Sequence, residues 1–277
     1  MIEWVVPPRR PLLRQPVTLA ALAWLALVGI GAGLAPFLAP LGPLAADTAH
    51  VLVPPGPGWL LGTDLLGRDL WARILWGARW TPGMGVMALA VTVGLGLPTG
   101  LVAGTVGGWI DAILMRLVDA LLAFPGILLA MAVVALLGPG LVPVAVAVGV
   151  AAAPAYARVT RSAAMEVRAQ PYVEAARAVG CTEWRIMVRH VLPNAAAPLV
   201  AFAAAQLGWV LLNGAALNFL GLGAPPGTPE WGAMLAEGRG YLRDAPWVST
   251  FPGLALTLTV LAANLVGDGL QETLRPR

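Results

Sequence analysis

Six long apolar segments constrain this chain more than any other feature of its sequence. Most are close to the ~20 residues that an α-helix needs to cross the hydrocarbon core of a bilayer. The segments lie at residues 17–38, 82–106, 112–137, 141–157, 198–220 and 250–267, and the fourth is the shortest. The first is too long for the ~7–15-residue core of a signal peptide, so we expect it to be retained as an anchor. The sequence therefore predicts an all-α, polytopic integral membrane protein with six transmembrane helices.

The composition supports this class and excludes several chemistries. Of the 277 residues, 58% are hydrophobic and only 11% are charged, which is far less charge than a soluble domain of this length carries. All 17 basic residues are arginine, so the chain lacks the lysine that a P-loop places on nucleotide phosphates. The arginines are distributed among short loops, a pattern that argues against nucleic-acid binding.

The distribution of arginine predicts the orientation, because cytoplasmic loops are enriched in positive charge. With both termini in the cytoplasm, twelve of the 17 arginines fall on the cytoplasmic side. These twelve are Arg9, Arg10, Arg14, Arg116, Arg158, Arg161, Arg168, Arg177, Arg185, Arg189, Arg275 and Arg277. Residues 1–16 and 271–277 are then cytoplasmic tails.

A polar helical stretch at residues 171–194, PYVEAARAVGCTEWRIMVRHVLPN, interrupts the apolar segments. Pro171 suits the first position of a helix, and Gly180 suits the left-handed residue that ends one. Thr182 can then cap a second short helix, which Pro193 is expected to stop. We interpret the stretch as a docking surface within a cytoplasmic loop at residues 158–197.

Six residues of this loop resemble the cytoplasmic loop of ABC-importer permeases. They are Glu174, Ala175, Ala176, Gly180, Leu192 and Pro193. His190 stands where the general pattern has isoleucine, but the run Arg189–Asn194 resembles the dipeptide, oligopeptide and nickel branch of that family. The two alanines are small enough to let a partner approach closely.

A second resemblance to the same branch lies in the predicted outer loop, residues 39–81. Gly62–Asp64 and Gly67–Asp69 are similar to the segment that precedes the second span in those permeases. Thr63 or Asp64 can cap a helix that runs to about residue 80. Its tryptophans and aliphatic residues predict an amphipathic helix at the membrane surface.

A third resemblance lies near the C-terminus, where the run Gly267–Leu270 is similar to the end of the same permeases.

Polar groups and glycines inside the spans predict packing more than chemistry. Gly96, Gly100 and Gly104 recur every four residues, which lets another helix approach closely. Arg116 and Asp119 are three residues apart and are expected to form a structural ion pair.

Gln206 and Asn213 are seven residues apart and share one face of the fifth span. They are candidates for lining the pathway, although hydrogen bonding between helices explains them equally well. Asn218 and Asn264 are the other amides at membrane depth.

The resemblance implies the permease subunit of an ATP-driven importer in the cell (inner) membrane of a bacterium or archaeon, for peptides, nickel or related small solutes. It implies a type 1 permease core at residues 82–270, preceded by the first helix and its outer loop at residues 17–81. The implied partners are a second homologous permease, two ATP-binding subunits and an extracytoplasmic substrate-binding protein. The chain itself would need no cofactor and perform no catalysis.

Two other classes fit the sequence less well. A secondary transporter or channel generally needs ionisable groups within its spans, and here they are nearly absent. A membrane-embedded enzyme would have to build its site from the few nucleophilic or metal-ligating residues of the chain. Its serines, histidines and cysteine are Ser162, Ser249, His50, His190 and Cys181. They show neither metal-ligand spacing nor a nucleophile motif.

Overall fold

The computed structural model describes residues 16–274 as an elongated bundle of helices, with only two isolated β-bridges and no longer strand in that range. The helices are α1 (Pro16–Leu38), α2 (Leu70–Val106), α3 (Gly108–Leu122), α4 (Gly126–Leu137), α5 (Leu141–Arg168), α6 (Pro171–Ala178), α7 (Glu183–Ile186), α8 (Leu192–Phe219), α9 (Trp231–Gly238) and α10 (Trp247–Leu274). Arg9, Arg10, Arg14, Arg275 and Arg277 lie outside the described residues, as do most of the two predicted tails.

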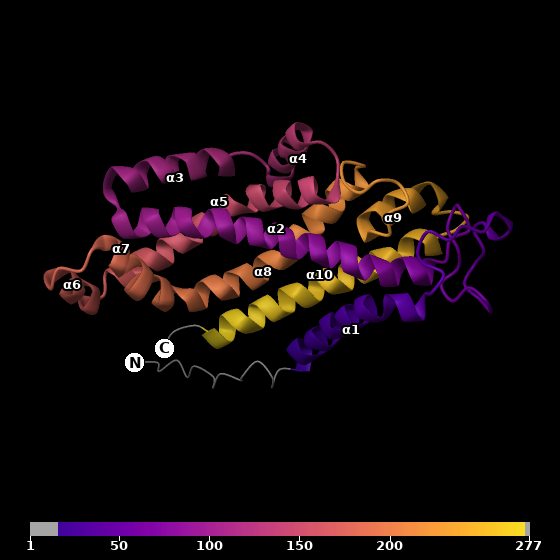
Figure 1. The fold of residues 1–277 in the computed structure, drawn as a ribbon, viewed down its shortest axis with the longest axis horizontal. Helices are drawn as coiled ribbons and strands as arrows, with labels where there is room; N and C mark the ends of the chain where they lie inside the picture. The colour runs from indigo at the N-terminus through magenta and orange to yellow at the C-terminus, as the bar shows by residue number, and fades with distance from the viewer. Residues whose placement is uncertain (1–15, 275–277) are drawn as a thin grey trace, which may run out of the picture.

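Within residues 16–274, five helices are long and apolar enough to cross a membrane, and a sixth crossing results if α3 and α4 count as one. The predicted all-α membrane fold is confirmed, and the predicted number of six spans is met when α3 and α4 together form one span. The long helices run along the longest axis of the molecule (Figure 1). The short helices α6 and α7 project at one end, and the segment between α1 and α2 lies at the other (Figure 1).

The third predicted span is broken. Its two halves, α3 and α4, are bent by 94° relative to each other at a short break. The break falls at Pro125, which precedes α4 directly. Proline lacks the N–H that a continuing helix needs, and its ring disfavours helical backbone in the residue before it. The apolar pattern runs through the break, so hydropathy alone could not reveal the bend.

Helix α2 is longer than predicted, because the expected surface helix and the expected second span form one continuous helix. Asp69 caps it, accepting hydrogen bonds from the backbone N–H groups of Trp71 and Ala72. The prediction that Thr63 or Asp64 caps this helix is wrong. Asp64 instead accepts hydrogen bonds from the backbone N–H groups of Leu66 and Arg68, in the turn before the helix.

A glycine seam joins α2 to α5. A β-carbon added at Gly96 would lie 2.7 Å from the carbonyl oxygen of Ala153, and one at Gly104 would lie 2.7 Å from that of Arg161. A β-carbon at Gly100 would collide with the carbonyl of Ala157 between them. The predicted close packing of this stripe is confirmed, and its partner is α5.

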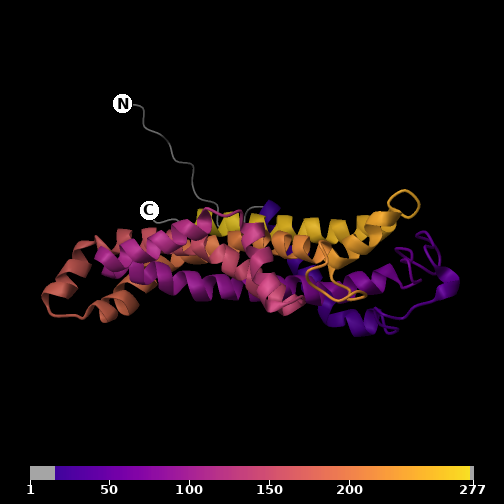
Figure 2. The same ribbon diagram turned by 90° about the horizontal axis from the view of Figure 1, so that it is seen from above.

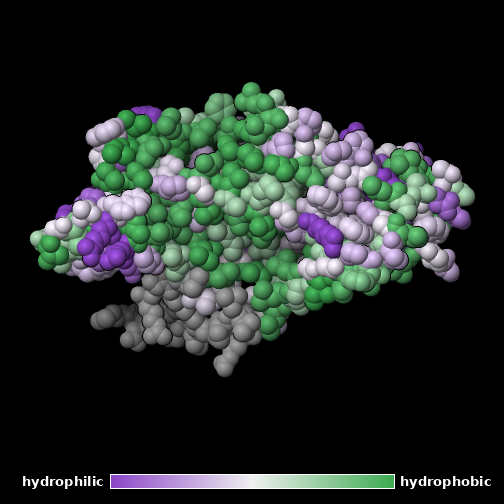
Figure 3. Space-filling view, viewed as in Figure 1, coloured by the Kyte–Doolittle hydropathy of each residue, from purple (hydrophilic) through white to green (hydrophobic). Residues whose placement is uncertain are grey.

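The outside of the bundle is apolar around its middle, and hydrophilic residues gather toward the two ends (Figure 3). The outward-facing side chains of the long helices are aliphatic, and Leu27, Val86 and Leu212 are each more than half exposed. An apolar surface of this extent does not suit contact with water, but it suits contact with lipid.

Candidate coupling loop and pathway

Helix α6 is held to the bundle through one buried side chain. Val173 is fully buried in an apolar cluster with Leu101, Ala164, Ile186 and Val191, so α2, α5 and the α7 region all contribute to its anchor. Pro171 occupies the start of α6, as predicted from the sequence. Fixing α6 in this way determines which of its residues face outward.

Four of the six motif residues lie on α6 and in the turn after it, and the other two, Leu192 and Pro193, begin α8. Glu174 and Ala175 are exposed, and Ala176 is half-buried. Gly180 follows the helix with φ of +86°, the left-handed conformation expected there. Thr182 caps α7 by accepting a hydrogen bond from the backbone N–H of Arg185 at 3.3 Å.

The prediction that Pro193 stops the second helix is wrong. A π-helical turn over Met187–Val191 follows α7, and α8 begins directly after it at Leu192. Pro193 stands in the first turn of α8, where a missing N–H is tolerated. The carbonyl of His190 accepts a hydrogen bond from the Asn194 side-chain amide at 2.7 Å. Helix α7, the π-helical turn and α8 therefore form one continuous helical rod from Glu183 to Phe219, whereas α6 is separated from it by the turn at Gly180.

Large apolar side chains stand exposed around the motif. Tyr172 is 45% exposed, Trp184 is 70% exposed and Val179 is 81% exposed. This end of the molecule is one of the two ends at which hydrophilic residues gather, away from the apolar middle of the bundle (Figure 3). Apolar surface in such a polar setting typically marks contact with another protein. None of these three residues belongs to the sequence motif, although aromatic residues within a polar stretch were a usable signal for them.

Charges near this loop are paired across the surface. Arg177 and Glu183 join α6 to α7 at 2.7 Å, and this hydrogen bond raises the pKa of the Arg177 guanidinium. Asp119 pairs with Arg158 of α5, so the expectation that it pairs with Arg116 is wrong. The cause is the packing of α3 beside α5, which places the two charges opposite each other.

A second contact between α3 and α5 is bidentate. The Arg161 guanidinium donates to both carboxylate oxygens of Asp111, at 2.5 and 2.6 Å. Together with the Asp119 pair, it attaches α3 to α5 at two levels.

The two candidate pathway residues stand on α8 and are both half-buried. The Asn213 amide donates to the carbonyl of Trp209 in its own helix at 2.9 Å. Asn218 shapes the turn after α8, since its side-chain oxygen accepts from the N–H of Ala224 at 2.8 Å. The lining role of Gln206 and Asn213 remains a prediction.

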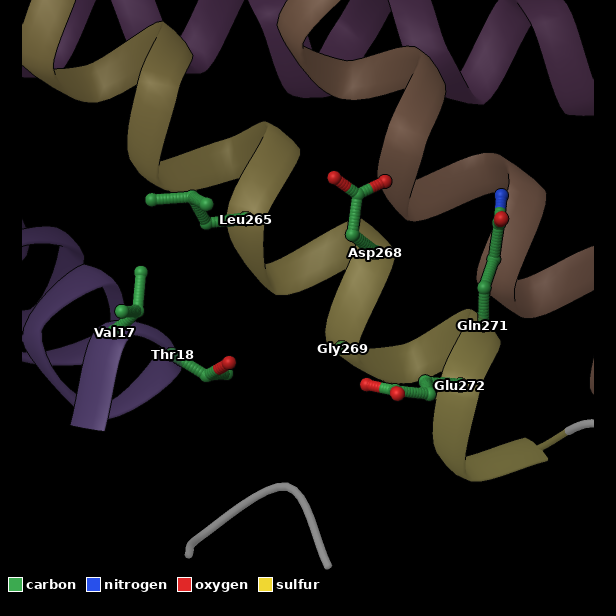
Figure 4. A pocket seen from close by; sticks show the side chains of 7 residues that line it. All are labelled: Val17, Thr18, Leu265, Asp268, Gly269, Gln271 and Glu272. Carbon is green, nitrogen blue, oxygen red and sulfur yellow. The ribbon is translucent and has the colours of Figure 1, made fainter. Parts of the chain in front are cut away.

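A pocket of about 340 Å³ lies between α1 and α10 (Figure 4). Its lining residues are Val17, Thr18, Leu265, Asp268, Gly269, Gln271 and Glu272. Asp268, from the Gly267–Leu270 run, is exposed there. The acidic groups of this pocket come from α10, whereas α1 contributes an aliphatic and a hydroxyl side chain (Figure 4).

Comparison with known proteins identifies the family. The model of the "Binding-protein-dependent transport system inner membrane component" family matches residues 96–277. The chain is 44% identical to the glutathione transport system permease protein GsiD of Pectobacterium atrosepticum, over 78% of this chain and 72% of that protein. It is 42% identical to the di/tripeptide transport system permease protein DppC of Pseudomonas aeruginosa, over 94% of this chain and 88% of that protein.

The fold also matches a solved structure, which is described as showing inward-facing conformations of the MetNI methionine ABC transporter. The TM-score is 0.62 at 22% identity, covering 74% of this chain and 97% of that chain. At this identity the match bears on the fold alone. The family model and the relatives show more: the chain belongs to the inner membrane components of binding-protein-dependent transport systems, as a multi-pass permease subunit of an ABC importer.

Proposed function

We propose that this chain forms half of the translocation pathway of a peptide-class importer and takes its energy from ATPase subunits docked on α6 and α7. The observation that carries the proposal is the outward face of the loop. Exposed Glu174 and Ala175 stand beside the exposed apolar side chains of Tyr172, Val179 and Trp184. A small-residue surface framed by aromatic and aliphatic groups fits a groove on a partner protein.

The full assembly would contain a second homologous permease, two ATP-binding subunits and an extracytoplasmic substrate-binding protein. Residues 82–270 would form the type 1 core, residues 158–197 its coupling loop, and residues 17–81 an additional helix with its outer loop. Both termini would be cytoplasmic. In agreement with this, α1 begins and α10 ends toward the α6–α7 end of the bundle (Figures 1 and 2). A peptide-class substrate is inferred from the names of the relatives.

The docking role is tested by Glu174→Arg, which reverses a charge at the centre of the proposed contact. We expect loss of ATPase capture in a pull-down and loss of substrate uptake, with normal membrane insertion. Asp244→Arg is the matched control, because Asp244 is an exposed carboxylate in the segment between α9 and α10. Normal ATPase capture by Glu174→Arg would refute the docking role.

The topology is tested with the only cysteine of the chain, Cys181, which is partly exposed between α6 and α7. A membrane-impermeant maleimide should label inverted vesicles from which the ATPase subunits have been stripped. It should not label intact spheroplasts, and restored ATPase subunits should protect the thiol. Labelling of intact spheroplasts would place the loop outside the cell.

A further inference from the structure

Three buried charged side chains and a partly buried fourth lie together at the end of the bundle opposite α6. We call them the outer charge cluster: Asp64 and Arg68 from the turn before α2, Arg73 from the first turns of α2, and Glu237 from α9. Asp64, Arg68 and Arg73 are each at most 3% exposed. The sequence predicted an amphipathic helix at the membrane surface here, and the burial of these side chains shows that its start is packed into the bundle.

The cluster is closed by short, charge-assisted contacts. Arg73 donates to Asp64 at 2.6 Å and to Glu237 at 2.7 Å. Arg68 donates to the same two carboxylates, at 2.6 and 2.9 Å. Each carboxylate thus accepts from both guanidinium groups, and the four charges sum to zero. Contacts of this kind are stronger and geometrically more selective than neutral hydrogen bonds.

Backbone groups extend the cluster into the segment before α9. The second oxygen of Glu237 accepts a hydrogen bond from the N–H of Gly227 at 3.0 Å. Deeper in the bundle, the hydroxyl of Thr81 on α2 donates to Glu230 at 2.9 Å and accepts from the N–H of Trp231 at 3.0 Å. The outer part of α2 is therefore attached to α9 and its lead-in at two levels.

The ionic contacts of the cluster are not expected to open one at a time, because most of the cluster is buried. A buried ion pair that loses one partner leaves an uncompensated charge in a low-dielectric site, so partial opening is strongly disfavoured. The arrangement is held together as a unit or lost as a unit. An element attached in this way moves with the helix to which it is attached.

The other end of α2 leads back to the coupling loop. Gly96, Gly100 and Gly104 seat α2 directly on the backbone of α5. Helix α5 ends at Arg168, and α6 begins three residues later at Pro171. A continuous chain of packed elements thus connects the coupling loop to α9, which lies between α8 and α10 at the far end (Figure 1).

We propose that the outer charge cluster is a rigid joint that makes α9 move with α2, so that ATP-driven displacement of the coupling loop reaches the far end of the pathway. Arg68 and Glu237 are then positioning residues for transport, because they act through α9 and not on the substrate. The inference builds on the proposed docking of ATPase subunits on α6.

The test uses the complete transporter reconstituted in lipid, with Arg68→Gln, Glu237→Gln and the double variant. Each single variant leaves the cluster with a net charge of one, whereas the double variant keeps the Asp64–Arg73 pair and a net charge of zero. We expect each single variant to retain ATPase capture and basal ATP hydrolysis within twofold. Stimulation of hydrolysis by the substrate-loaded binding protein should fall at least tenfold, and the double variant should recover part of it. Asp244→Asn is the control, as an exposed carboxylate outside the cluster.

Two results would overturn the rigid joint. One is unchanged stimulation in both single variants, which would show that α9 needs no ionic attachment to α2. The other is an equal loss of basal and stimulated hydrolysis, which would show that the cluster only stabilises the fold. Failure of the docking proposal would give a different result. In that case Glu174→Arg would bind the ATPase normally, as the cluster variants do.

Discussion

The outer charge cluster and the coupling loop contain similar charged residues but use them in opposite ways. In the outer charge cluster, two arginines and Asp64 are buried and pair with one another and with partly buried Glu237. In the coupling loop, Arg177 and Glu183 are both more than a third exposed. The apolar side chains around that pair are exposed as well. Charges at one end of the molecule are paired within the chain and largely buried, whereas the other end exposes the apolar surface that we propose for ATPase docking.

This difference indicates where each end can tolerate change. Buried pairs contribute through geometry and are damaged by the loss of one partner. Exposed pairs contribute little energy of their own, because water screens them. Substitutions of similar charged residues should therefore lower the free energy of unfolding more in the outer charge cluster than in the coupling loop.

The largest effect on stability is expected from Arg73→Met. It removes the guanidinium that bridges Asp64 and Glu237, and it leaves the cluster with excess negative charge. Breaking a buried pair in this way typically costs about 3–5 kcal/mol. Thermal unfolding of the purified protein in detergent provides the measurement. Arg243→Met, at an exposed position outside the cluster, is the control and should change stability by about 0.5 kcal/mol or less. Equal stability of the two variants would remove the contrast between the ends.

The next effect is expected from Gly100→Leu in the seam between α2 and α5. A side chain there collides with the carbonyl of Ala157 and with Thr160, so the helices must separate. Overpacking of this kind typically lowers the free energy of unfolding by about 1–3 kcal/mol. Here it should also weaken the connection between the coupling loop and the outer charge cluster. Thermal unfolding and stimulated ATP hydrolysis both report it. Gly94→Leu is the matched control on the same helix, because a β-carbon at Gly94 meets nothing within 4 Å.

A smaller and more local effect is expected from Thr182→Ala. The substitution removes the cap of α7, and such losses typically amount to about 1 kcal/mol. Hydrogen exchange should increase at residues 182–186 while the outer cluster stays protected. Thr182→Ser keeps the hydroxyl and should behave like the unmodified protein. Increased exchange at Glu237 as well would mean that the two ends are less independent than the structure indicates.

The smallest effect is expected from Glu183→Gln, which removes the exposed pair with Arg177. Exposed pairs contribute roughly 0–1 kcal/mol, so thermal stability should scarcely change. Uptake should also stay close to normal if docking depends on the apolar side chains and Glu174. A large loss of uptake with intact stability would instead assign this pair to the ATPase interface.

Features that depend on neighbouring residues could be predicted from the sequence, whereas contacts between residues far apart in the chain could not. Apolar length located the spans, the four-residue glycine repeat located the α2–α5 seam, and Gly180 and Thr182 marked the helix ends that the structure contains. Each of these depends on a residue and its immediate neighbours. The partner of Asp119 and the burial of Arg73 depend on residues 39 and 164 positions away, respectively, so no local pattern could reveal them.

The coupling-loop residues were named from a motif, and the structure adds why they are presented outward. Val173 anchors one side of α6, and this leaves Glu174 and Ala175 on the other. The error at Pro193 has a similar origin. Proline usually ends a helix, but the π-helical turn before it and its place in the first turn of α8 remove that conflict.

The π-helical turn at Met187–Val191 has a consequence for the phase between the coupling loop and α8. A π-helical turn accommodates one residue more than the same stretch of α-helix. Deleting one residue there would restore an unbroken α-helix but rotate α7 by about 100° relative to α8. Trp184 on α7 would then face a different direction, whereas α6 is held separately by its connection to α5 and by buried Val173. The direction in which α7 presents Trp184 is thus set by one additional residue in the helix that joins α7 to α8.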